Sequence, residues 1–164
     1  MADEQSPSRD EIIWDRLVEV YEAFLLATSA FLSEDVDRVA LIRKAFYGSK
    51  GHRMPAIFFL DYLKVEELEA LFDDLVLLGG RSERSSWAIR NIIATMPPEW
   101  VRAHIEKAVE PLLPTDDFLQ WRLVLELCAG IDRDLTLKLA RRASEHSDYD
   151  IREAGEDFLE KYGG

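Results

Sequence analysis

The stretch "DYDIREAGEDFL" (residues 148–159) contains the local pattern from which the fold of this chain can be predicted. Its apolar and small residues recur three or four positions apart, the spacing that places side chains on one face of an α-helix: Ile151, Ala154, Gly155, Phe158 and Leu159. Asp148 suits the N-cap, where a carboxylate accepts hydrogen bonds from the first unpaired backbone N–H groups. We therefore predict an amphipathic helix from Asp148 to about Tyr162.

An apolar residue followed directly by an arginine marks the start of this helix and of two helices upstream. The three pairs are Ile89-Arg90, Trp121-Arg122 and Ile151-Arg152, at offsets of 32 and 30 residues. Ile57 occupies the equivalent place another 32 residues earlier, although Phe58 follows it instead of an arginine. Because each anchor begins a helix that is followed by a turn and a second helix, the spacing predicts tandem helical pairs.

Capping residues, prolines and glycines divide the chain into helices. Ser8 with Glu11 makes a capping box, and Pro55 suits the first turn of a helix. The first predicted helix covers residues 9–32, and a second is opened by Ser33 or Asp35 and ended by Gly48, after which residues 48–54 form a loop. Four more helices cover residues 55–63, 65–78, 82–95 (opened by Ser82) and 97–112. Thr115 and Asp132 cap the next two, and the last covers residues 148–162. No segment alternates like a strand, so we expect an all-α fold of about nine helices.

Length and composition favour a single acidic domain spanning residues 1–164. A chain of this length can bury a core of its own. Cys128 is the only cysteine, so no disulfide can form within the chain, and the N-terminal residues lack the basic and apolar segments of a secretory signal. These features indicate a cytoplasmic protein with no membrane partner. The formal net charge of -12 repels phosphate backbones and attracts basic surfaces, which argues against nucleic acid as a partner.

One segment departs from this acidity: residues 38–54 contain five bases and no acid. Arg43, Lys44, Lys50 and Arg53 could hold a phosphate, but no phosphate-loop glycine pattern accompanies them. The interpretation we favour is that they balance acids of the first helix or of residues 66–74.

The helical pairs resemble the HEAT-like repeats, including the short form of phycobilin-lyase-type and other bacterial HEAT-like proteins. The resemblance covers residues 55–164, and residues 1–54 would be an N-terminal helical cap or degenerate repeats. It implies a short right-handed α-solenoid of helical hairpins, whose second helices line a concave binding surface. It also implies that three arginines tie neighbouring units together: Arg90, Arg122 and Arg152.

Catalytic and metal-binding signatures are absent from the sequence. The three histidines, His52, His104 and His146, have neither the spacing nor the cysteine or glutamate partners of a zinc site. Paired acids such as Asp73-Asp74 are adjacent on a helix, where they diverge by about 100° and cannot converge on one substrate atom. We expect a protein that is not an enzyme and that needs no cofactor or metal.

The second helices of the pairs carry the candidate partner-binding residues. An acidic stripe beside an aromatic side chain suits the capture of a basic protein surface. The candidates are Glu66, Glu69, Asp73, Asp74, Trp100, Glu106 and Glu110. Among the other tryptophans, we assign Trp87 and Trp121, which lie on first helices, to the core.

These observations favour a non-enzymatic protein-binding module that sequesters or neutralises a basic protein. In size and charge the chain resembles small acidic bacterial immunity proteins, whose partner is a toxin. An adaptor or scaffold subunit is the nearest alternative. Other HEAT-like proteins are alkylbase DNA glycosylases and chromophore lyases, but the net charge opposes the first and no pigment cleft is evident for the second.

Overall fold

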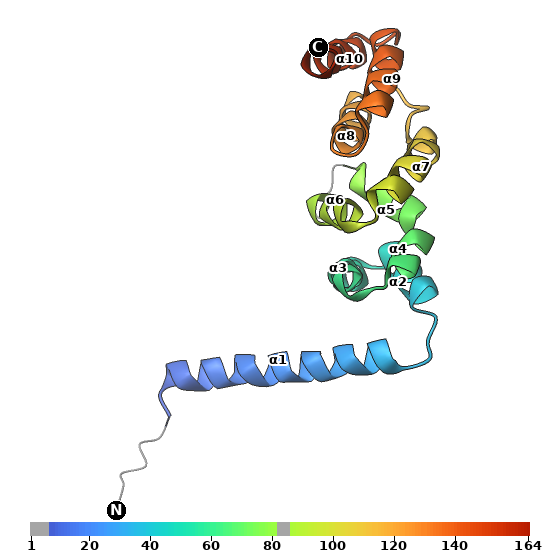
Figure 1. Ribbon diagram of the computed structural model, residues 1–164. Helices are drawn as coiled ribbons and strands as arrows, with labels where there is room; N and C mark the ends of the chain where they lie inside the picture. The colour runs from blue at the N-terminus through green and yellow to red at the C-terminus, as the bar shows by residue number, and fades with distance from the viewer. Residues whose placement is uncertain (1–6, 82–85) are drawn as a thin grey trace, which may run out of the picture. The chain divides into compact units, whose positions relative to one another are not determined.

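The computed structural model describes residues 7–81 and 86–164, which form ten α-helices and two 3-10 turns joined by short turns and loops, with no β-strand among them. The all-α prediction is therefore confirmed, with one α-helix more than expected. The elements are α1 (Arg9–Ser33), α2 (Arg38–Phe46), α3 (Lys50–Phe59), η1 (Leu60–Tyr62), α4 (Val65–Ala70), α5 (Phe72–Gly79), α6 (Ser86–Thr95), α7 (Pro98–Val109), η2 (Glu110–Leu112), α8 (Phe118–Ala129), α9 (Arg133–Ser144) and α10 (Tyr149–Tyr162) (Figure 1). No helix of the described residues is both long and apolar enough to cross a membrane.

The chain divides into two compact units, Met1–Asp37 and Arg38–Gly164. The first contains α1, which begins with the predicted capping box. The Ser8 hydroxyl accepts a hydrogen bond from the Glu11 N–H at 3.2 Å, and the Glu11 carboxylate accepts one from the Ser8 N–H at 2.7 Å. These bonds favour the ionised carboxylate and lower the pKa of Glu11.

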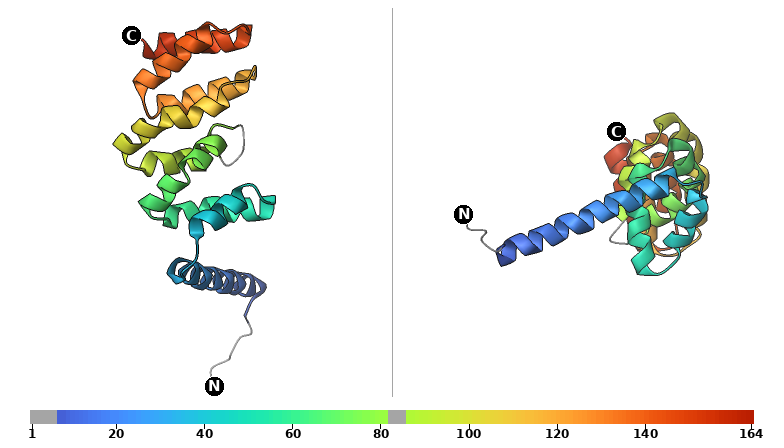
Figure 2. Two further views of the ribbon diagram at one scale, coloured as in Figure 1. Left: turned by 90° about the vertical axis from the view of Figure 1, so that its right-hand side faces the viewer. Right: turned by 90° about the horizontal axis from the view of Figure 1, so that it is seen from below.

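The second unit consists of helices that pack on their neighbours in the sequence. Helix α2 packs on α3, α5 on α6 and on α7, and α9 on both α8 and α10. Figures 1 and 2 show successive layers, in which α3, α6, α8 and α10 follow one another along one side and α2, α5, α7 and α9 along the other. Each helix therefore buries its apolar face against the layer before it, the layer after it or both.

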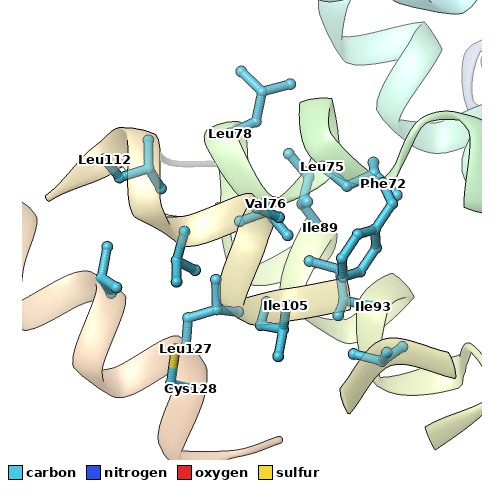
Figure 3. Close-up of a cluster of buried hydrophobic side chains, with 14 of the residues drawn as sticks. Phe72, Leu75, Val76, Leu78, Ile89, Ile93, Ile105, Leu112, Leu127 and Cys128 are labelled. Atoms are coloured by element: carbon cyan, nitrogen blue, oxygen red, sulfur yellow. The ribbon is translucent and has the colours of Figure 1, made fainter. Parts of the chain in front are cut away.

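The core of this unit is continuous from one layer to the next. Figure 3 shows buried side chains that α5, α6, α7 and α8 contribute to one cluster: Phe72, Leu75, Val76, Ile89, Ile93, Ile105, Leu127 and Cys128. Cys128 is fully buried, and this burial, with a smaller contribution from Asp132, raises the pKa of its thiol to about 12. Cys128 is thus an apolar core residue, as its surrounding sequence suggests.

The predicted loop at residues 48–54 is wrong, because helix α3 already begins at Lys50. Pro55 lies inside this helix and cannot donate a hydrogen bond to the carbonyl of Gly51. Burial of the following residues, Ala56 and Ile57, compensates for the missing bond. The preference of proline for the first turn of a helix is local, and tertiary packing overrides it at Pro55.

The helix predicted over residues 65–78 is two helices, α4 and α5, separated at Leu71. The backbone of Leu71 adopts φ -99° and ψ 0°, outside the helical region, while its side chain is fully buried. Its N–H still bonds to the carbonyl of Glu67, and its carbonyl accepts from Leu75. No i→i−4 bond from the N–H groups of Phe72, Asp73 or Asp74 crosses the break, so α5 is a new helix that begins directly after Leu71.

The remaining cap predictions have different outcomes. Asp132 and Asp148 cap α9 and α10 through their carboxylates, as predicted. Thr115 does not cap α8: Asp117 does, accepting from the N–H groups of Leu119 and Gln120, while the Thr115 hydroxyl accepts from Asp117 in the preceding turn. Ser82 lies outside the described residues.

Candidate functional site

The predicted partner-binding residues lie on α4, α5, α7 and η2. Glu66 and Glu69 belong to α4, Asp73 and Asp74 to α5, Trp100 and Glu106 to α7, and Glu110 begins η2. Their surroundings differ, and the differences divide them into acids that are paired within the chain, acids that are not, and one packed aromatic residue.

Glu106 and Glu110 are paired with bases of the next second helix, α9. Lys138 donates a hydrogen bond to Glu106, and Arg142 donates to both carboxylate oxygens of Glu110 at 2.9 and 3.1 Å. The hydrogen bond from Lys138 to Glu106 and the attraction between their charges raise the pKa of Lys138. Both pairs join residues 32 positions apart, the interval that also separates Ile89 from Trp121. Much of the negative charge of this part of the surface is thus neutralised within the chain.

Asp74 is also paired, with residues of α2 and the turn that follows it. Its carboxylate accepts from Arg43 Nε at 2.8 Å and from the Tyr47 hydroxyl at 2.7 Å. Burial and then the bond to Asp74 raise the pKa of Tyr47 to about 12. Arg43 Nη2 also donates to the carbonyl of Ala70. Asp74 therefore joins α5 to α2 and is not available in full to a partner.

Two bases of the basic segment, residues 38–54, pair with acids of residues 66–74, as the favoured interpretation predicts. Arg43 pairs with Asp74, and Arg38 Nε lies 2.7 Å from Glu67 Oε1. Burial raises the pKa of Glu67, but hydrogen bonds from the Lys64 backbone and Arg38 outweigh it, so that the pKa lies below its usual value. Arg53 donates instead to the carbonyl of Phe46 at 2.6 Å.

Glu66, Glu69 and Asp73 differ from the other acids of the surface. Among the residues that the structure describes, none of the three takes part in an ion pair or a side-chain hydrogen bond. Glu66 and Asp73 are exposed and Glu69 is half-buried. Glu66 and Glu69 lie three residues apart on α4, and Asp73 lies in the first turn of α5, directly after the break at Leu71. Together they form an uncompensated acidic surface, called below the α4–α5 acidic face.

Trp100 packs between two aromatic neighbours and is half-buried. Its ring stacks on His104 with centroids 3.9 Å apart and meets the edge of Phe72 at 5.0 Å. His104 is held by a hydrogen bond between its Nδ1 and the carbonyl of Trp100. Phe72 precedes Asp73 in α5, so Trp100 is linked through one ring to the α4–α5 acidic face.

The two tryptophans assigned to the core from the sequence, Trp87 and Trp121, differ in burial. Trp121 is 2% exposed and donates its indole N–H to the carbonyl of Thr115, which confirms its core assignment. Trp87 is 67% exposed, so its core assignment is wrong. The buried residues of α6 are Ile89, Ile92 and Ile93. At about 100° per residue, Trp87 lies on the opposite side of the helix from Ile89, a signal that the repeat alignment obscured.

Trp87 lines an apolar groove that was not predicted from the sequence. The groove lies between α3 and α6 and has a volume of about 410 Å³. Its apolar lining includes Met54, Phe58, Trp87 and Ile92, and Asp61 is a charged residue of the lining. Because Trp87, Met54 and Phe58 belong to the first helices of two successive pairs, the groove and the α4–α5 acidic face lie on different helices.

The three arginines of the repeat have three different sets of partners. Arg90 of α6 donates from Nε to the carbonyl of Gly79 at 2.8 Å, and from Nη2 to that of Leu123 at 3.4 Å, so it joins α5 and α8. Arg122 makes its ion pair with Glu126 of its own helix, a carboxylate that also lies 3.6 Å from Arg90 Nη1. Arg152 bonds to the carbonyls of His146 and Ser147, in the turn before α10. Only Arg90 has the tie between units that the resemblance implies.

Metal chemistry has no assembled ligand set in the described part of the chain. No group of three or more His, Cys, Asp or Glu side chains there is arranged to hold an ion. The histidines are separated, since His52 lies in α3, His104 in α7 and His146 in the turn after α9.

Comparison with known proteins adds no family to these observations: no protein-family model, no curated protein and no solved structure matches the chain.

Proposed function

We propose that this protein is a non-enzymatic binding module that captures a protein partner through the α4–α5 acidic face. In this proposal the layers of residues 38–164 form a short right-handed solenoid of HEAT-like helical pairs, and the partner presents a basic surface to the second helices. The role of the module is to sequester or neutralise that partner.

The observation that carries the proposal is the contrast between paired and unpaired acids. Asp74, Glu106 and Glu110 form ion pairs with bases of the same chain. Glu66, Glu69 and Asp73 have no such partner among the described residues, although Glu66 and Glu69 repel each other at helical spacing and Asp73 adds a third negative charge in the next helix. Keeping three like charges together on one face costs stability, and a basic partner would convert this cost into binding energy.

Electrostatic steering is the expected mechanism of capture. The net charge of -12 attracts a basic protein at long range, and the α4–α5 acidic face orients it on approach. Trp100, fixed by Phe72 and His104, supports the edge of this surface. Association should therefore be fast at low salt and slower as salt screens the charges.

The sharper form of the proposal is that the partner is a toxin and this chain is its immunity protein. Size and acidic charge support it, as does the compatibility of a basic nuclease surface with an acidic face. The adaptor alternative differs in what it predicts for stoichiometry, because an immunity protein binds one small partner in equal amounts and an adaptor joins a larger assembly.

The test is capture from a lysate of the source organism by the immobilised chain, at about 0.05 M and about 0.5 M salt. We expect one small basic protein in equal stoichiometry at low salt and its loss at high salt. The triple variant Glu66→Lys, Glu69→Lys, Asp73→Lys should slow association by at least about tenfold at low salt.

A matched control is available on α10, where Glu153, Glu156 and Glu160 are exposed and have the same spacing. Reversing these three to lysine changes the net charge by the same amount and should leave most of the association rate intact. Equal effects of the two triple variants would mean that only total charge matters, and the α4–α5 acidic face would lose its assigned role.

A further inference from the structure

Helix α1 exposes large apolar side chains along most of its length. Nine of them between residues 12 and 26 are 36 to 74% exposed: Ile12, Ile13, Trp14, Leu17, Val18, Val20, Tyr21, Leu25 and Leu26. Helices in a folded protein normally bury such residues, because burying each large apolar side chain stabilises by about 1.5–3 kcal/mol. The exposure of so many on one helix indicates a surface that is covered in use.

Seven of the nine side chains share one face of the helix. At about 100° per residue, they fall within an arc of about 160°. This surface, called below the α1 apolar face, consists of Ile13, Trp14, Leu17, Val18, Val20, Tyr21 and Leu25. The charged residues Asp15, Arg16, Glu19 and Glu22 occupy the opposite side, together with Leu26 and Ile12.

The spacing on this face is that of helices that pack against helices. Trp14, Leu17 and Tyr21 follow one another at intervals of three and four, the heptad spacing of a helix seam. The positions that flank such a seam usually carry charges that select a partner, but here they hold Ile13, Val18, Val20 and Leu25. The contact surface is therefore wide and uncharged.

The area of the face is that of a specific interface. With fractional exposures of 36 to 64%, its seven side chains leave roughly 700 Å² accessible, if a large side chain presents about 150–250 Å² in full. The largest apolar patch of a typical monomer is about 300–600 Å², and a stable interface buries about 800 Å² on each partner. The α1 apolar face thus approaches what one side of a stable dimer contributes.

A lipid surface is a poor match for this helix. Amphipathic helices that lie in membrane interfaces carry Lys and Arg on their polar side, which attract anionic lipids. The polar side of α1 has three acids and one base between residues 15 and 22. No described helix has the length and apolarity to cross a membrane.

We propose that the α1 apolar face binds the same face of a second copy of this chain. Two such faces are self-complementary, as a twofold interface requires, because each is apolar throughout. Between residues 13 and 25 the acids of each copy lie on the far side of its helix, whereas Asp10, in the first turn, is in line with the face and Glu11 lies at its edge. Along residues 13–25 the contact therefore brings no like charges together. The uncharged flanks contain no element that would exclude an identical helix.

Self-association through this face has a distinctive dependence on salt. Each copy carries a net charge of -12, and the two repel at long range. Salt screens this repulsion and leaves the apolar contact unchanged or stronger, so the dimer becomes tighter as salt rises. Capture of a basic partner by the α4–α5 acidic face weakens under the same change, which separates this inference from the proposed function.

The test is sedimentation equilibrium of the full chain over protein concentration, at low and high salt. The expected mass rises from 18.9 kDa towards twice that value with concentration, at a lower concentration when the salt is higher. A mass of one chain at all accessible concentrations, or an association that salt weakens, would overturn the proposal.

A pair of matched substitutions assigns the contact to this face. Leu17→Glu introduces a charge at its centre and should weaken association at least tenfold. Leu26→Glu makes the same chemical change at a residue that is 74% exposed on the charged side, and should leave association nearly unchanged. Circular dichroism of both variants confirms that α1 remains helical, and equal loss of association in both would contradict the assignment.

Discussion

Helices α1 and α10 have similar sequence patterns and opposite surroundings. Both begin with a capping side chain and carry apolar residues at helical spacing. In α10 the pattern is buried, with Ile151, Ala154 and Phe158 against the rest of the second unit. In α1 most of the pattern is exposed. Helical periodicity therefore predicts which face of a helix is apolar, but it contains no information about what covers that face.

The largest difference between the two helices is expected when the same side chain is shortened in each. Ile151 is fully buried, so Ile151→Ala should lower the free energy of unfolding by about 2–5 kcal/mol, through lost burial and a cavity. Ile13 is 60% exposed, and Ile13→Ala should change it by no more than about 0.5 kcal/mol. Denaturant unfolding of dilute protein measures both. A large loss for Ile13→Ala would show that α1 is packed within the chain.

A second difference lies in how closely α10 approaches its neighbour. A Cβ atom at Gly155 would lie 2.4 Å from the backbone nitrogen of Ser144 and 2.6 Å from the carbonyl oxygen of Ala140, both in α9. Backbone atoms cannot move aside as a flexible side chain can. Gly155→Ala should therefore destabilise by about 3 kcal/mol, at the upper end of the cost of overpacking.

Gly130 provides the control for this prediction, because a Cβ atom there meets only the carbonyl of Leu127 at 3.7 Å. Gly130→Ala should be neutral or slightly stabilising, since it also reduces the freedom of the unfolded chain. Equal stability of the two variants would contradict the close approach of α9 and α10.

A smaller effect is expected from Arg90 and Arg122, which occupy equivalent positions in the predicted helical pairs. Arg90 bonds to carbonyls of two other helices and is partly buried, so Arg90→Met should cost about 2 kcal/mol by leaving those acceptors unpaired. Arg122 contacts an exposed glutamate of its own helix, and Arg122→Met should change stability by less than about 0.5 kcal/mol. Similar losses for both would indicate that the repeat position, and not its particular contacts, determines the role.

Much of the fold could be predicted from local signals. The capping boxes and caps at Ser8, Asp132 and Asp148 follow from the hydrogen-bonding capacity of their side chains, which needs no tertiary context. The start of α3 and the break at Leu71 could not, because they depend on burial of Ile57 and Leu71 among distant residues.

The candidate surface was harder to predict because charges find partners across helices. Nothing local distinguishes Glu69 from Glu106, yet only Glu106 has a lysine 32 residues later in contact. That interval equals the predicted offset of 32 residues between helical pairs, so matching every acid with bases 32 positions away predicts the pairs of Glu106 and Glu110. The same period misled the reading of Trp87, where helical phase was the better signal.

Hydrogen exchange of α1 and α10 in the same sample, as a function of protein concentration, tests this contrast most directly. We predict that the amides of residues 12–26 exchange rapidly in dilute protein and become protected as concentration rises, because only a second copy covers them. The amides of α10 should be protected at every concentration. Protection of α1 equal to that of α10 in dilute protein would contradict the account, since the apolar face of α1 would then be covered within a single chain.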